Sequence, residues 1–309
     1  MKLLHRIETV GLLRKSFREF RENDPLRMAG ATAFFTTFAL PAVLIILIQV
    51  FGLIFSPRMM TRQLLKNLAD IVGNKTASEL HKTLINVHHL SSTWYFAAGG
   101  FLFLIFVSTT LFKVIKDSLN QLWNIRMKGK VGITFNLLNR AKSFIVILFT
   151  GILFLSVLMA EGLLNFLSNT LHDQFPEKHL MLNLLVNQGI SLLVVTIWFT
   201  VIFKFLPDGR PVWRVAITGG FFTGILFSLG KLLLKWLLSY SNMQTIYGAS
   251  ASSALLLLFV FYAALIFYYG ACFTSVWAVY LNKPIQPGKN AVIYKWSPVK
   301  GTKIGTDEK

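Results

Sequence analysis

Ionisable side chains within otherwise apolar stretches are the residues of this sequence that most directly suggest chemistry. They are Glu161, Lys231 and Lys235, and a charge buried in lipid is costly and usually serves a function. Glu161 and Lys231 each follow the start of their stretch by about 18 residues, which places them at similar depth in two helices running outward. Lys235 follows Lys231 by one turn on the same helix face. We expect Glu161 to pair with a lysine or these groups to line a polar cavity; independent snorkelling of each side chain is the alternative.

A second candidate site is a long segment without charge. Residues 239–253 contain many hydroxyl and amide side chains and Gly248, but no Asp, Glu, Lys or Arg. A polar yet neutral stretch between two apolar ones is typical of a re-entrant or unwound segment that lines a water-filled cavity, and an ordinary loop is the alternative. The expected contacts with a polar or amphipathic substrate are Tyr240, Asn242, Gln244, Tyr247 and Ser250.

The sequence offers little for catalysis or metal binding. His81 and His88 are seven residues apart, with His89 beside them and Glu79 as the nearest acid, but a metal site needs a further ligand. A solvated amphipathic helix is the alternative interpretation of these histidines. Most of the 13 acidic residues are scattered, and no Gly-rich phosphate loop of the Walker type occurs. We therefore expect no enzyme, no metal site and no cofactor.

The composition narrows the class of protein that carries these residues. The 309 residues are 54% hydrophobic and 14% charged, with 31 Lys and Arg against 13 Asp and Glu and a net charge of +18. The mean hydropathy of +0.58 excludes a disordered basic tail, and the single cysteine, Cys272, excludes a disulfide framework. A nucleic-acid-binding protein and a membrane protein with its cations sorted to one side remain.

Six apolar stretches are each long enough to cross a bilayer as a helix, which takes about 20 residues. Six such stretches leave too little polar sequence to cover them as the core of a soluble protein. The sequence therefore predicts an all-α fold, a polytopic membrane protein whose six transmembrane helices lie within residues 28–281. The stretches cover residues 28–55, 94–112, 143–167, 180–205, 213–238 and 253–281.

The basic residues are sorted between the connections of these stretches. Twenty-three of the 31 Lys and Arg residues lie before residue 28, in 113–142, in 204–214 and after residue 281, whereas six lie in the other three connections. Lys and Arg accumulate in the cytoplasmic loops of membrane proteins, so both termini are predicted to be cytoplasmic. Orientation explains the charge without nucleic acid, and anionic lipids at the cytoplasmic face are the expected partners.

Segments outside the spans complete the predicted organisation. Residues 1–27 are expected to form an amphipathic cytoplasmic helix on the membrane surface, and a frayed solvated tail is the alternative. The external loop of about 56–93 carries apolar stripes for further helices. The segment of about 113–142 is basic and cytoplasmic. Residues 282–309 form a basic cytoplasmic tail, which is expected to be disordered.

Small residues and a proline are expected to shape the helices. Gly220 and Gly224 form a Gly-x-x-x-Gly pair, a spacing that lets a neighbouring backbone approach closely. The partner helix belongs either to the same chain or to a second copy in an oligomer. Pro41 lacks a backbone N–H and predicts a kink in the first span.

Several short motifs resemble the BrkB/YihY family of bacterial inner-membrane proteins, formerly labelled the ribonuclease BN family. The family commonly has an acid after Gly270-Ala271, where this chain has Cys272, so a role of that acid is not carried over. The resemblance covers roughly residues 17–281 and implies a six-helix membrane fold and transport of lipid or another envelope component. The matching motifs are Met28 to Pro41, Asn120 and Trp123 within 118–123, 204–207 followed by Trp213, Tyr240 with 247–249, and Gly270-Ala271.

Two functions fit these observations. The first is a transporter or flippase-like protein for an anionic or amphipathic envelope component such as lipid, with a polar cavity formed by Glu161, Lys231 and residues 240–253. The second is a non-transporting scaffold or interaction protein, a solid bundle whose basic surfaces bind anionic lipid or partners. A ribonuclease is disfavoured, because the sequence lacks a catalytic constellation.

Overall fold

A computed structural model describes residues 2–51, 61, 62, 65, 69, 77–82, 94–128, 176–239 and 251–294 of the chain. Within these residues the chain is mostly helical, as the sequence predicts. The long helices are α1 (Lys2–Glu22), α2 (Pro25–Phe51), α5 (Trp94–Leu122), α7 (Pro176–Phe205), α8 (Trp213–Ser239) and α10 (Ala251–Tyr280).

Five of the six predicted spans coincide with described helices. Helix α2 follows the first span, α5 the second, and α7, α8 and α10 the last three; the third span, 143–167, lies outside the described residues. In the described part of the chain, two helical stretches are long and apolar enough to cross a membrane, Trp213–Leu234 and Ser253–Tyr280. The count of six spans stays a prediction.

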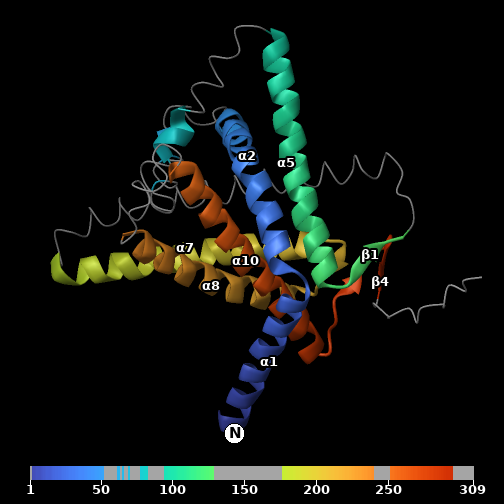
Figure 1. Cartoon of the computed structure of the whole chain (residues 1–309). Coiled ribbons are helices and arrows are strands. Elements are labelled where there is room, and N and C mark those ends of the chain that lie inside the picture. Colours follow the sequence, from blue (N-terminus) through green and yellow to red (C-terminus); the bar gives the residue numbers. More distant parts are fainter. Residues whose placement is uncertain are drawn as a thin grey trace, which may run out of the picture.

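The core lies where α5, α7 and α10 meet. Helix α2 runs beside α5 and packs against α10. Helices α7 and α8 form a hairpin whose axes cross those of α2 and α5 at a large angle (Figure 1). The rings of Phe199, Phe203 and Phe267 stack with centroids 5.3–6.4 Å apart. Beside them the buried Tyr268 hydroxyl lies 2.6 Å from Thr32 Oγ1 of α2. Stacked aromatic rings and a satisfied hydroxyl leave this part of the interior closely packed.

Helix α8 meets α7 through the glycines that the sequence singled out. Gly220 and Gly224 are buried and face Thr200 and Thr196 of α7. A Cβ atom on Gly220 would lie 2.8 Å from the Thr196 carbonyl oxygen, a distance that the backbone of α7 could relieve only by moving. This small-residue face of α8 therefore packs within the chain.

A second small-residue contact joins α8 to α10. Gly219 of α8 faces Thr274 of α10, and Gly270 of α10 faces Thr223 of α8. Each threonine hydroxyl donates to a carbonyl of its own helix, Thr274 to Gly270 and Thr223 to Gly219, both at 2.7 Å. The hydroxyls are thus satisfied while their side chains fill the space opposite a glycine.

Helix α1 occupies most of the expected N-terminal segment and packs against α10. The Phe20 and Phe17 rings lie edge-on to Tyr269 at 5.6 and 6.2 Å, and the Tyr269 hydroxyl donates to the Leu13 carbonyl at 3.4 Å. Ser16 is fully buried. Helix α10 therefore covers one face of α1, and the exposed basic side chains within residues 11–22 of α1 are Arg14, Lys15, Arg18 and Arg21.

The expectation of an all-α fold misses four short strands. β1 (Ile125–Met127) pairs antiparallel with β4 (Ala291–Ile293), and β2 (Gly209–Arg210) pairs antiparallel with β3 (Gln286–Pro287). The disorder that the sequence analysis expects from residue 282 onward is wrong for residues 282–294, which carry β3 and β4. Strands of two or three residues whose partners lie far along the chain produce no local hydrophobic pattern.

Candidate functional site

The C-terminal ends of α5, α7 and α10 are joined to one another by the paired strands. β1 follows α5, β2 connects α7 to α8, and β3 and β4 follow α10 (Figure 1). We call residues 123–128, 204–214 and 282–294 the basic cap, because they contain seven Lys and Arg residues and one acid. Strand pairing places on one side three segments that the charge sorting also assigns to one side. The alternation of the loops across the membrane stays a prediction.

Asp208 is the centre of a hydrogen-bond network in the basic cap. Lys116 Nζ lies 2.9 Å from Asp208 Oδ1, and these side chains are only 15% and 12% exposed. Asn120 donates from Nδ2 to Asp208 Oδ2 and accepts the Asp208 backbone N–H through Oδ1, both at 2.8 Å. The Asp208 carbonyl accepts the Gly288 N–H at 2.8 Å. One residue thus joins α5, the α7–α8 connection and the C-terminal strands.

Trp123 and Gly209 close the inner side of the basic cap. Trp123 Nε1 donates to the Ala271 carbonyl of α10 at 3.0 Å, and both groups are buried. A Cβ atom on Gly209 would lie 2.6 Å from Ile125 Cδ1 and 2.8 Å from Trp123 Cε3. β2 can therefore lie this close to Trp123 only because residue 209 has no side chain.

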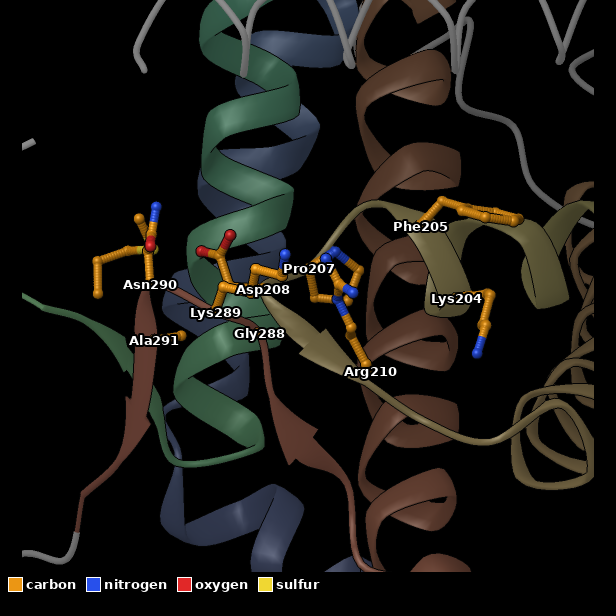
Figure 2. Close-up of a pocket in the computed structure, with 10 residues that line it drawn as sticks. Lys204, Phe205, Pro207, Asp208, Arg210, Gly288, Lys289, Asn290 and Ala291 are labelled. Atoms are coloured by element: carbon orange, nitrogen blue, oxygen red, sulfur yellow. The ribbon is translucent and has the colours of Figure 1, made fainter. Parts of the chain in front are cut away.

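A cavity of about 530 Å³ opens in the basic cap (Figure 2), a volume within the usual range for small-molecule sites. In Figure 2, Lys204 and Phe205 lie at the end of α7, and Asn290 and Ala291 lie on the opposite side of the cavity. Three lining side chains are cationic and one is acidic. The lining residues are Met127, Lys204, Phe205, Pro207, Asp208, Arg210, Gly288, Lys289, Asn290 and Ala291.

Aromatic rings border the cavity on the α7 side. Phe205 and Trp213 lie edge-on with centroids 5.9 Å apart, and both are more than half exposed. Lys204 Nζ donates to the Pro211 carbonyl at 2.6 Å and lies 5.3 Å from the centre of the Trp213 ring. Exposed Trp rings beside cations are typical of the membrane–water interface.

Asp117 is a second acid close to the basic cap. Desolvation raises the pKa of its carboxyl, although the Lys113 and Lys116 ammonium groups act in the opposite direction. Its neighbour Lys116 pairs with Asp208 instead. Because its pKa is raised, the Asp117 carboxyl takes up a proton at a higher pH than a free carboxyl does. Its negative charge near the cap is therefore lost earlier as the pH falls.

The sequence matches the family described as Virulence factor BrkB over residues 16–292. The chain belongs to this family. The matched range begins within α1, contains α2, α5, α7, α8 and α10, and ends within β4. The basic cap is therefore almost entirely within the BrkB match.

Relatives of this BrkB-family chain are named as membrane proteins. The UPF0761 membrane protein of Haemophilus influenzae (strain 86-028NP) is 24% identical over 271 residues, which cover 87% of this chain and 95% of that protein. The UPF0761 membrane protein of Pseudomonas paraeruginosa is 26% identical over 251 residues, which cover 79% of this chain but 57% of its own length. No solved structure matches the chain. With the apolar helices, these names identify the BrkB-family chain as a membrane protein, and they state no enzymatic activity.

Much of the polar site that the sequence predicts in this BrkB-family protein falls on undescribed residues. Lys231 lies on α8 and is partly exposed, and Lys235 lies one turn further along α8. Helix α2 continues through Pro41, where the kink stays a prediction. The pairing of the charges and the polar cavity also stay predictions, since the residues outside the described part are Glu161, Tyr240, Asn242, Gln244, Tyr247 and Ser250.

The histidine cluster is described only in part. Glu79 pairs with Lys82 at 3.0 Å, and the buried His81 Nδ1 has no hydrogen-bond partner among the described residues. His88 and His89 lie outside the described part. Within residues 77–82 and the other described ranges, no three His, Cys, Asp or Glu side chains gather as a metal site would require.

No sequence pattern predicts the cavity residues Asp208, Arg210 and Lys289. The BrkB resemblance does single out 204–207 and the Asn120–Trp123 region, and the structure brings these together through Asp208 and Asn120. In the sequence, the density of cations in 204–214 indicates orientation alone. The same cations also line a cavity.

Proposed function

We propose that this BrkB-family protein is a transporter or flippase-like protein for an anionic or amphipathic envelope component such as lipid. It crosses the bacterial inner membrane six times, with both termini and the basic cap in the cytoplasm. The cavity of the basic cap carries the proposal, because it offers an anionic headgroup a cation-lined site where several helices end. Transport requires such a site on at least one side of the membrane.

The surroundings of the cavity support an amphipathic rather than a purely soluble substrate. Phe205 lines the cavity, and Trp213 lies against it, so a polar recess adjoins exposed apolar surface. Basic pockets at the cytoplasmic side of membrane helices suit anionic lipid headgroups. The path of the substrate through the membrane would be formed by Glu161, Lys231, Lys235 and residues 240–253.

Lipid movement in vesicles tests the proposal directly. The full chain is reconstituted with acyl-labelled fluorescent phosphatidylglycerol, and an impermeant reductant then bleaches the outer leaflet. We expect protein-containing vesicles to lose the protected inner-leaflet fraction as well, because lipid reaches the outer leaflet. Bleaching that stops at the level of protein-free vesicles would contradict a flippase.

The charges within the spans allow a sharper test of the path. Glu161→Lys is expected to reduce lipid movement, and Lys231→Glu or Lys235→Glu in the same chain is expected to restore it if the charges pair. Restoration by neither change would reject the pairing. Arg14→Glu on the exposed side of α1 is the matched control, since it changes charge away from the proposed path.

A scaffold is the second candidate, favoured by the close packing of Phe199, Phe203 and Phe267 in the described core. A scaffold would bind anionic lipid through the basic cap without moving it. The vesicle experiment separates the two functions, because a scaffold leaves the rate of lipid movement unchanged.

A further inference from the structure

The cations around the cavity differ in whether the protein already uses them. Lys204 is engaged by the Pro211 carbonyl and the Trp213 ring. In the described part of the chain, neither Arg210 nor Lys289 takes part in an ion pair. Both are exposed, so their charges are available to a ligand.

The acid of the cavity does not compete for these two cations. Asp208 Oδ1 is bound by Lys116 at 2.9 Å, and Oδ2 accepts from Asn120 at 2.8 Å. The half-buried Lys116 thus balances the Asp208 charge from the α5 side. The cavity consequently has an excess positive charge on the side of Arg210 and Lys289.

Arg210 and Lys289 belong to elements that lie against each other. Arg210 is in β2, which pairs with β3, and Lys289 lies in the turn that follows β3. A Cβ atom on Gly288 would lie 3.6 Å from Arg210 Nε, so the guanidinium lies beside this turn. The turn is closed by the Ala291 N–H, which donates to the Gly288 carbonyl at 3.0 Å. A fixed turn and a short strand hold the two cations at one site.

An apolar stripe leads from the cavity along α8. Trp213, Ile217 and Phe221 follow each other at intervals of four residues and are 53%, 51% and 48% exposed. This spacing places them on one helix face, and the Trp213 ring touches Phe205 at the cavity. Gly219 and Thr223, which contact α10, lie on the other side of α8, whereas Gly220 and Gly224, which contact α7, lie beside the stripe. The stripe spans about 12 Å along the helix axis, which is the length of a short acyl chain.

We infer that the cavity of the basic cap binds the headgroup of an anionic phospholipid. The phosphate lies between Arg210 and Lys289, and an acyl chain follows Trp213, Ile217 and Phe221. The planar guanidinium matches phosphate oxygens with two parallel hydrogen bonds, and the ammonium adds a point charge. The choice of a lipid rests on the proposed function, but the site requires binding and not movement.

Binding is measured on the purified full chain in a neutral detergent. Short-chain phosphatidylglycerol is titrated by isothermal calorimetry, with short-chain phosphatidylcholine as the headgroup of no net charge. We expect phosphatidylglycerol to bind more tightly, and Arg210→Ala and Lys289→Ala each to weaken it at least about tenfold. Ile217→Asn is expected to weaken it as well, because the acyl chain loses an apolar contact.

Matched controls use cations of the basic cap that do not line the cavity. Arg126→Ala and Lys283→Ala remove exposed charges from the same cap and are expected to leave phosphatidylglycerol binding unchanged. Equal losses in all four variants would overturn the site in favour of general charge attraction. Inorganic phosphate is added as a competitor of phosphatidylglycerol in the last arm. If phosphate alone displaces the lipid fully and Ile217→Asn does not change lipid binding, the assignment to a phospholipid is overturned.

The site and the proposed function can fail separately. Binding with the expected pattern, but no lipid movement in vesicles, keeps the site and rejects transport. Lipid movement that survives Arg210→Ala and Lys289→Ala, without headgroup-dependent binding, rejects the site and keeps transport.

Discussion

The α8 interfaces and the basic cap are stabilised in opposite ways. Along α8, glycines lie opposite threonines of α7 and α10, and contact depends on the absence of a side chain. In the basic cap, contact depends on the presence of charge and hydrogen-bonding groups around Asp208. Packing of small residues suits helices in lipid, where the hydrophobic effect does not drive association, whereas a charged network suits the aqueous end of a helix.

The largest expected effect tests the α8 side of this comparison. Gly220→Ala would bring a Cβ atom to 2.8 Å from the Thr196 carbonyl oxygen, and we expect destabilisation of about 3 kcal/mol through overpacking. Gly189→Ala in α7 is the matched control, because a Cβ atom there meets nothing within 4 Å. Thermal unfolding in detergent measures both, and equal midpoints would contradict the close approach of α7 and α8.

The next effect tests the basic cap. Asp208→Asn removes the carboxylate charge that pairs with the Lys116 ammonium, and we expect a loss of about 2 kcal/mol because the pair is largely shielded from water. Lys116→Met in the same chain should recover part of that loss. The control is Glu22→Gln, which breaks the exposed Arg18–Glu22 pair (71% and 67% exposed) and should cost only a few tenths of a kcal/mol. Equal effects of Asp208→Asn and Glu22→Gln would show that the Asp208 network does not stabilise the cap.

A smaller effect tests the hydrogen bond between the basic cap and α10. Trp123→Phe removes the Nε1 donor to the Ala271 carbonyl and is expected to cost about 1 kcal/mol. Trp277→Phe is the matched control, because the buried Trp277 Nε1 has no partner among the described residues. The unfolding midpoint should fall for the first variant and not for the second, and the reverse order would contradict the assigned bond.

The smallest effect concerns the contact of α1 with α10. Burial raises the pKa of Glu19, against the opposing influence of Lys15. The Glu19 pKa is higher in the folded state than in the unfolded state. The contribution of this carboxyl to folding stability is therefore present at low pH and is lost as the pH rises through the raised pKa. Glu19→Gln should therefore give a slightly higher unfolding midpoint at neutral pH, with a difference that vanishes in acid. A difference that grows in acid would contradict the sign.

The sequence predicted the helices far better than the basic cap. The length and hydropathy of stretches such as 213–238 and 253–281 predict membrane helices. Helices α8 and α10 begin and end within two residues of these stretches. The Gly220–Gly224 pair predicted close packing but not that α7 is the partner helix. The spacing of small residues in one helix does not specify which helix packs against it. The cap escaped prediction because Asp208 and Asn120 are 88 residues apart and the strands are too short to leave a pattern.

The most direct test of the proposed function is to determine on which side of the membrane the basic cap lies. Lys289→Cys provides an exposed thiol in the cavity, whereas the native Cys272 is buried. An impermeant maleimide should label it in inverted membrane vesicles and not in intact spheroplasts, and Lys82→Cys in the predicted external loop should show the opposite pattern. Labelling of Lys289→Cys from the outside of spheroplasts would contradict a cytoplasmic basic cap and, with it, the proposed orientation of the protein in the membrane.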